Sequence, residues 1–258
     1  MKPIVLLLAN TLSLLVTLAV NYGAGTGALT NTSIGEISDR YPTLLTPAGW
    51  AFSIWGLIYL LLILFTAYQW VAWKKGRTDE SLKPAGIWFL LVNLANALWV
   101  VVWLNEWLGL SVLLIFLLLF CLIMLVLRLR LEVWDAPLRI ILFVWWPICI
   151  YTGWITLASI TNVSVWLKSL QWDPLLLSAG GWALLLVVVA GLLYLFLTWK
   201  RNMREAALVG VWGLSAIAYK QWNNAEAVAI ICLVVALLVF LSAAYHGYKN
   251  RHASPFFS

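Results

Sequence analysis

The feature that most constrains this chain is a run of about twenty-five uncharged, mostly apolar residues that follows Pro47. At about 1.5 Å of rise per residue, a helix of this length crosses a hydrocarbon core about 30 Å thick. Similar runs recur along the chain, in which 64% of residues are hydrophobic and 10% are charged. A water-soluble domain does not have this balance, and the runs lack the alternation of a transmembrane barrel. The sequence therefore predicts an all-α integral membrane protein.

The apolar runs predict about eight transmembrane helices. They are expected at residues 3–22, 48–73, 86–107, 109–128, 138–163, 175–198, 206–221 and 226–246. For the first run, an uncleaved helix is preferred over a cleaved signal peptide, whose apolar region is normally only about 7–15 residues long.

The basic residues separate onto two sides when the predicted helices alternate in direction. Thirteen of the sixteen lysines and arginines fall on the side of both termini, and only Arg40, Lys168 and Lys220 fall on the other. The positive-inside rule then places both termini in the cytoplasm of a multi-pass protein of the cell (inner) membrane, with the lipid bilayer as its first partner. The basic residues form no single patch, so nucleic-acid binding is not expected. A homodimer is left open.

Groups that carry catalysis or bind metals are not gathered inside the predicted spans. The ten Asp and Glu residues fall in loops or at span ends, which disfavours an ion-coupled pump. Cys121, Cys149 and Cys232 have no metal-ligand spacing, and both histidines lie in the C-terminal segment. We therefore predict no catalytic residue, no metal site and no required cofactor, and an enzyme is not the favoured class.

Tryptophan is the most unusual part of the composition, with 18 residues. Many lie near predicted span ends, where an interfacial belt accounts for them, but others lie well inside the spans, where each indole N–H needs an acceptor. In the second predicted helix, Phe52, Trp55 and Tyr59 share one face, with Trp50 just before them. Large rings at one end of a span indicate a partner that is itself flat and hydrophobic.

Two further predicted helices combine tryptophan with asparagine. In helix 86–107, Asn96, Trp99 and Trp103 share a face at i, i+3 and i+7. Asn93 is expected to form an interhelical hydrogen bond, whereas Asn96 fits such a bond and a ligand contact equally well.

In helix 138–163, Trp154, Ala158 and Asn162 continue one face at i, i+4 and i+8, and Pro147 is expected to kink the helix. The helix between these two, at 109–128, is almost purely aliphatic and phenylalanine-rich, which predicts a lipid-facing scaffold.

The segment Gly23–Thr46 is expected to be the longest non-helical stretch, on the side to which these aromatic faces point. Loops of this length are binding lids or disordered linkers, and the two alternatives stay open here.

Three of these stretches together resemble the translocator protein / tryptophan-rich sensory protein (TspO/MBR) family. They are Pro47-Ala-Gly-Trp-Ala-Phe52 followed by Trp55 and Tyr59, then Asn96-Ala-Leu-Trp99, and Trp154-Ile-Thr-Leu-Ala-Ser-Ile-Thr-Asn162. The resemblance covers about residues 3–166 and departs from the family pattern at Ala48, which stands where the family has a second proline.

The resemblance implies a five-helix bundle around a hydrophobic pocket that takes tetrapyrroles such as protoporphyrin or haem-like molecules, and sterols in some members. It divides the chain into a five-helix ligand-binding domain, residues 1–166, and an additional three-helix membrane segment with a cytoplasmic tail, residues 167–258.

The favoured function is therefore the binding of a planar hydrophobic ligand, tetrapyrrole or sterol-like, in a sensory or transport role. The candidate ligand-binding residues are Trp50, Phe52, Trp55, Tyr59, Asn96, Trp99, Trp103, Trp154, Ala158 and Asn162. Two alternatives stay open: a small-solute transporter and a light-dependent porphyrin-degrading enzyme.

Overall fold

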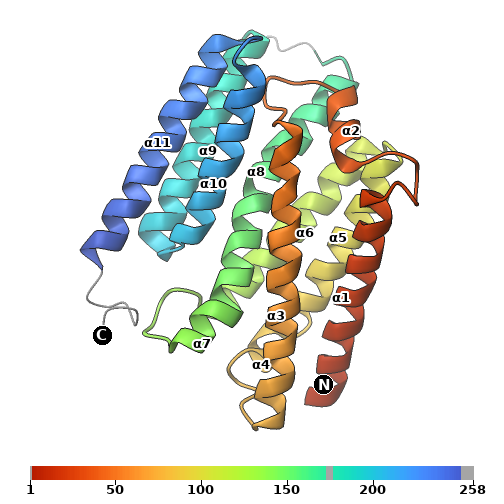
Figure 1. The fold of residues 1–258 in the computed structure, drawn as a ribbon, viewed down its shortest axis with the longest axis vertical. Coiled ribbons are helices and arrows are strands. Elements are labelled where there is room, and N and C mark those ends of the chain that lie inside the picture. Colours follow the sequence, from red (N-terminus) through yellow and green to blue (C-terminus); the bar gives the residue numbers. More distant parts are fainter. Residues whose placement is uncertain (1, 173–176, 251–258) are drawn as a thin grey trace.

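The computed structural model describes residues 2–172 and 177–250, and all regular secondary structure in these two ranges is helical. The long helices run side by side along the molecule (Figure 1). They are α1 (Pro3–Gly25), α3 (Ile54–Lys74), α5 (Trp88–Leu104), α6 (Leu108–Arg128), α8 (Trp146–Ser169), α9 (Ala179–Arg201), α10 (Arg204–Gln221) and α11 (Glu226–Lys249). The short elements are α2 (Ile34–Arg40), the 3-10 turn η1 (Gly49–Ser53), α4 (Leu82–Ala85), α7 (Leu138–Ile140) and the π-helical turn η2 (Ile141–Trp145).

Each of the eight predicted apolar runs forms a long helix, but not every one qualifies as a membrane span. Six helical stretches of the described chain are long and apolar enough to cross a bilayer. Of the other two helices, α5 is apolar but has only 17 residues, and α10 begins with the charged residues Arg204 and Glu205. The protein is thus a multi-pass helical membrane protein, and the predicted count of eight spans is not confirmed.

Five of the long helices close into a ring. In order of contact, α1 packs on α5, α5 on α6, α6 on α8, α8 on α3, and α3 on α1. The largest cluster of buried hydrophobic side chains fills this ring. The run at 109–128 corresponds to α6, which packs against both α5 and α8. This helix is therefore part of the ring as well as a lipid-facing surface.

The remaining helices α9, α10 and α11 form a three-helix unit, which contacts the ring mainly through α10 against α8 (Figure 1). The contact is close because small residues line it: a methyl group added to Gly153 of α8 would come within 2.6 Å of the Ala206 carbonyl oxygen of α10. A methyl group on Gly210 would overlap the ring of Tyr194, whose hydroxyl donates to the Gly153 carbonyl at 2.9 Å. The small residues of α10 therefore dock the extra helices, as close packing in membranes requires.

The helix that contains Pro147 is irregular where the sequence predicts a kink. Proline cannot donate a backbone hydrogen bond, and its ring crowds the carbonyl one turn earlier. The turn just before it, Ile141–Trp145, is π-helical, so the strain predicted at Pro147 takes the form of one widened turn.

Residues 26–48, which we call the cover segment, lie across the end of the molecule that carries α2 (Figure 1). The prediction of a non-helical stretch is wrong here, because α1 continues to Gly25 and α2 forms inside the segment. A capping box starts α2: the Ser33 hydroxyl accepts from the Glu36 N–H at 3.2 Å, and the Glu36 carboxylate accepts from the Ser33 N–H at 2.6 Å. Below, this end is the α2 end, and the opposite end, where α1 begins and α11 finishes, is the α4 end (Figure 1).

Candidate functional site

The Trp55 side chain is the centre of an aromatic cluster inside the five-helix ring. It is 7% exposed. Its ring centroid lies 5.4 Å from that of Tyr59 on the same helix, 6.4 Å from Trp99 on α5, and 5.8 and 6.3 Å from Tyr151 and Trp154 on α8. Three helices that are distant in sequence thus bring their rings to one place, as their shared faces predict.

Two more rings extend the cluster toward the α2 end. Trp103 stacks on Trp99 with 5.5 Å between centroids, and Phe52 meets the edge of Trp154 at 6.1 Å. Offset-stacked and edge-to-face pairs at these separations are the favoured arrangements of aromatic rings. We define the aromatic cluster as Phe52, Trp55, Tyr59, Trp99, Trp103, Tyr151 and Trp154.

One side of the aromatic cluster is held by hydrogen bonds. The Trp99 indole donates to Asn162 Oδ1 at 2.8 Å, and the Asn162 amide donates in turn to the Ser111 hydroxyl at 2.8 Å. Asn162 therefore positions a ring of the cluster and already has two partners. Ser111 gave no signal in the sequence, because a single serine in an aliphatic helix is also an ordinary small residue.

The other side contains buried polar atoms without a partner. Among the described residues, no hydrogen-bond partner is present for the indole nitrogens of Trp55 and Trp154, the Tyr59 hydroxyl or Asn96 Nδ2. Asn96 does accept a hydrogen bond from Asn21 of α1, at 2.8 Å. A buried polar group left unpaired costs about 1–3 kcal/mol, so four of them near one set of rings call for a functional explanation.

Asn93, in contrast, has the interhelical bonds that its sequence position predicts. Its side chain donates to Ser13 of α1 at 3.0 Å, and its backbone carbonyl accepts from Thr17 at 2.8 Å. These bonds close the α1–α5 side of the ring away from the aromatic cluster.

Trp50 lies apart from the aromatic cluster. It is 40% exposed and packs at 4.6 Å against Trp212 of α10, whose indole donates to the Ala51 carbonyl at 3.2 Å. The 3-10 turn accounts for this, because its tighter winding rotates Trp50 away from the face that Phe52 and Trp55 share. Ala158 is partly buried against the same core as the cluster, one turn beyond Trp154.

The cover segment is fixed to both parts of the molecule. On the ring side, the Trp103 indole donates to the Ile34 carbonyl at 3.1 Å, and Arg40 and Tyr41 reach Glu106 at 2.5 and 2.7 Å. The hydrogen bond to the Glu106 carboxylate raises the pKa of Tyr41.

On the three-helix side, Lys220 donates to Asp39 at 2.9 Å, and Gln221 donates to the Thr43 carbonyl at 3.2 Å. The segment therefore touches both the aromatic cluster and α10.

A cluster of three side chains that could bind a metal ion lies at the α4 end, where the ring meets the three-helix unit. The side-chain ligand atoms of Glu132, Cys149 and Glu205 lie within 4.8 Å of one another, a spacing that a metal ion could use. Burial and, to a smaller extent, the nearby Glu205 charge raise the pKa of Glu132 to about 8, and Arg204 opposes the shift. Because these residues are far apart in sequence, no spacing rule could have found the group.

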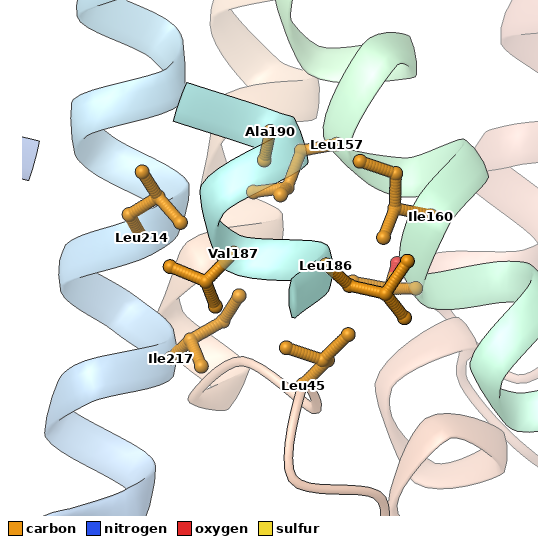
Figure 2. A pocket seen from close by; sticks show the side chains of 9 residues that line it. Leu45, Leu157, Ile160, Leu186, Val187, Ala190, Leu214 and Ile217 are labelled. Atoms are coloured by element: carbon orange, nitrogen blue, oxygen red, sulfur yellow. The ribbon is translucent and has the colours of Figure 1, made fainter. Parts of the chain in front are cut away.

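A narrow apolar recess lies between α8, α9 and α10, close to the α2 end (Figure 2). Its side chains pack so closely that it leaves no room for a water molecule. The lining residues are Leu45, Leu157, Ile160, Thr161, Leu186, Val187, Ala190, Leu214 and Ile217. None of them belongs to the aromatic cluster, so the two features are separate.

Comparison with known proteins agrees with the resemblance of the motifs. No curated protein and no solved structure matches the chain. The model of a family described as TSPO-like protein matches residues 6–245. The match runs through the five-helix ring and most of the three-helix unit, so this chain belongs to the TSPO-like protein family.

Proposed function

We propose that the protein binds a planar hydrophobic ligand, a tetrapyrrole or sterol-like molecule, among the rings of the aromatic cluster. The observation that carries this proposal is the set of buried polar atoms on Trp55, Trp154, Tyr59 and Asn96 that have no partner among the described residues. A flat ligand with one polar edge would give these groups acceptors while its faces stack on indole rings.

Binding on this site requires the rings to part. Trp55, Trp99 and Trp154 are 7%, 5% and 3% exposed, and they contact one another directly. A ligand would replace these ring–ring contacts with ring–ligand contacts of the same kind. The exchange is favourable because the ligand also pairs the buried donors.

The cover segment gives such a ligand a way to act at a distance, which supports a sensory or transport role. Displacement of Trp103 would weaken its bond to Ile34 of α2, and α2 lies in the same segment that Asp39 and Thr43 attach to α10. A change in the cluster would thus reach the three-helix unit through a short series of hydrogen bonds. Such coupling needs two arrangements of the segment, which ligand binding would select between.

The test is a titration of the full-length protein in nanodiscs with protoporphyrin IX, followed by quenching of tryptophan fluorescence. We expect saturable quenching whose midpoint shifts about tenfold upward in Trp55→Phe and in Trp154→Phe, because each loses a stacking surface and a donor worth about 1.4 kcal/mol together. Trp222→Phe, which changes an indole that is 52% exposed, is the matched control and should leave the midpoint unchanged.

Three outcomes would overturn the proposal or redirect it. Equal midpoints in all variants would mean that the ligand binds elsewhere. Loss of the porphyrin absorbance under light, with a new product, would favour the light-dependent enzyme. Absence of quenching by protoporphyrin, and of competition by cholesterol, would leave the transporter alternative.

A further inference from the structure

The three side chains that meet at the α4 end come from three different elements. Glu132 lies in the turn after α6, Cys149 lies near the start of α8, and Glu205 lies in the first turn of α10. Their ligand atoms, two carboxylate oxygens and Cys149 Sγ, lie within 4.8 Å of one another. Two of these elements belong to the five-helix ring and the third to the three-helix unit, so the cluster lies on the contact between them.

The polar atoms of this cluster are buried and unpaired. Cys149 is 0% exposed, and its free thiol lies beside both carboxylates without a hydrogen-bond partner among the described residues. Glu132 Oε1 and Glu205 Oε2 are also buried, and neither accepts a hydrogen bond from any residue that the structure describes. Carboxylate oxygens excluded from water are costly unless an opposite charge compensates them. The cluster therefore calls for a positive charge between its three ligand atoms.

The two arginines nearby do not supply this charge by direct contact. Arg201 donates through Nη2 to the Leu131 carbonyl at 3.5 Å. Arg204 reaches toward α11, where its Nη1 would lie 3.2 Å from a methyl group placed on Gly247. Neither arginine forms an ion pair within residues 2–172 and 177–250. The guanidinium groups thus leave the three ligand atoms available for a smaller cation.

The donor set selects the class of metal ion. Two oxygens and one sulfur do not suit calcium or magnesium, which take oxygen ligands, or copper(I), which takes soft sulfur ligands. Zinc binds both thiolate and carboxylate, usually with four ligands in a tetrahedron. Ligand atoms around such an ion lie about 3.5 Å apart, so small rotations of the two glutamate side chains bring the observed spacing into range. The fourth position is left for water.

An ion can reach the cluster from the α4 end. Glu132 and Glu205 are partly exposed, whereas Cys149 is fully buried. The two carboxylates can therefore capture the ion before the thiol completes the set of protein ligands. The positive-inside rule predicts that this end faces the cytoplasm, where thiols stay reduced.

We propose that Glu132, Cys149 and Glu205 form a zinc site that fastens the three-helix unit to the five-helix ring. The two carboxylates and the thiolate bind the ion directly, and the protons that these groups hold in the metal-free protein are released to water. Unfolding separates the three ligands, so the free energy of zinc binding adds to the stability of the folded protein. None of the three residues belongs to the aromatic cluster, and the site does not depend on the ligand proposed there.

The first experiment uses the full-length protein in detergent, without an affinity tag and stripped of metal with EDTA. Cobalt(II) serves as a coloured probe for zinc, because a cobalt–thiolate bond has its own near-ultraviolet absorption band. We expect a saturable band that zinc displaces and that is absent in Cys149→Ser. Cys121→Ser, which changes another buried cysteine of the ring, is the matched control and should keep the band.

Zinc affinity and thermal stability test the two carboxylates. Glu132→Gln and Glu205→Gln should each weaken zinc binding at least about tenfold. Both variants should also lose most of the rise in thermal midpoint that zinc gives the unchanged protein. Glu226→Gln, on the exposed first turn of α11, is the matched control and should respond to zinc as the unchanged protein does.

Each measurement can overturn the proposal. Absence of the thiolate band in the unchanged protein, or an equal band in Cys149→Ser, would show that Cys149 does not bind the metal. Equal zinc affinity in Glu205→Gln and the unchanged protein would show that the ion binds elsewhere. This second result decides alone if circular dichroism shows that Cys149→Ser does not fold, because Glu205 is partly exposed and its replacement keeps the side-chain shape.

Discussion

Inside the ring of α1, α3, α5, α6 and α8, large aromatic side chains meet, whereas α9, α10 and α11 meet through alanine, valine and glycine. The aromatic cluster and the α8–α10 contact also differ in how their polar groups are paired. Around Trp55, several buried donors lack acceptors in the part of the chain that the structure describes, whereas the Tyr194 hydroxyl at the α8–α10 contact donates to the Gly153 carbonyl. The comparison indicates that the three-helix unit is tightly packed, while the aromatic cluster retains unpaired buried donors among the described residues.

The tight packing of α10 gives the largest expected effect. Gly210→Ala should destabilise the protein by about 2–3 kcal/mol, because its new methyl group meets the Tyr194 ring, which is fully buried and cannot retreat. The thermal midpoint in detergent measures it. Gly56→Ala is the matched control: no atom lies within 4 Å of the added methyl group, and alanine favours the helix, so this variant should be neutral or more stable. Equal midpoints for the two variants would contradict the picture of a tightly packed unit.

The stability of the contact between the ring and the three-helix unit should depend on pH. Glu132 lies in the turn after α6, and its carbonyl accepts from Asn202 of the α9–α10 turn at 2.6 Å. Because its folded-state pKa is raised to about 8, the folded protein favours the protonated carboxyl. Its contribution to stability is therefore full at acidic pH and declines as the pH rises from the unfolded value of about 4.5 through about 8.

Glu132→Gln should remove this pH dependence, since glutamine resembles the protonated form. Thermal midpoints measured at pH 5, 7 and 9 test it, with Glu226→Gln on the exposed first turn of α11 as the control. If the unchanged protein is as stable at pH 9 as at pH 5, Glu132 is not held in its neutral form.

Two tryptophans of the aromatic cluster differ in their hydrogen bonds, and their replacement should therefore differ in its effect on stability. Trp99→Phe leaves Asn162 Oδ1 without its donor, whereas Trp154→Phe removes an indole nitrogen that has no partner within residues 2–172 and 177–250. Both variants lose the same ring area, so the Trp99 variant should be the less stable of the two by about 1 kcal/mol. Equal midpoints would mean that the Trp154 nitrogen is already paired, and this would weaken the proposed ligand site.

Much of this architecture could be predicted from the sequence, and the parts that could not have definite physical reasons. Long uncharged runs locate helices because the bilayer leaves no other way to satisfy the backbone. The convergence of Trp55, Trp99 and Trp154 followed from their helical faces, because a ring buried in one bundle must point inward. The direction of Trp50 did not follow, since the 3-10 turn of Gly49–Ser53 changes the rotation per residue.

Other features depend on contacts between distant residues. The bond from Asn162 to Ser111 joins positions 51 residues apart, and Glu132 meets Glu205 only after α9 has folded back on the ring. The helix α2 could have been predicted, because Ser33 and Glu36 have the spacing of a capping box. The neighbouring Gly, Thr and Ser residues suggested a loop instead.

The smallest expected effect on stability concerns the ion pair that joins the cover segment to α10. Asp39→Asn breaks the exposed ion pair with Lys220 and should cost less than about 1 kcal/mol of stability, because exposed pairs contribute little. If the proposed function holds, its effect on coupling should be larger than on stability, because the Asp39–Lys220 bond joins the cover segment to α10. Hydrogen exchange of residues 204–221, with and without protoporphyrin, measures this. Ligand should change exchange there in the unchanged protein and less in Asp39→Asn; an identical response would show that the cover segment does not carry the signal.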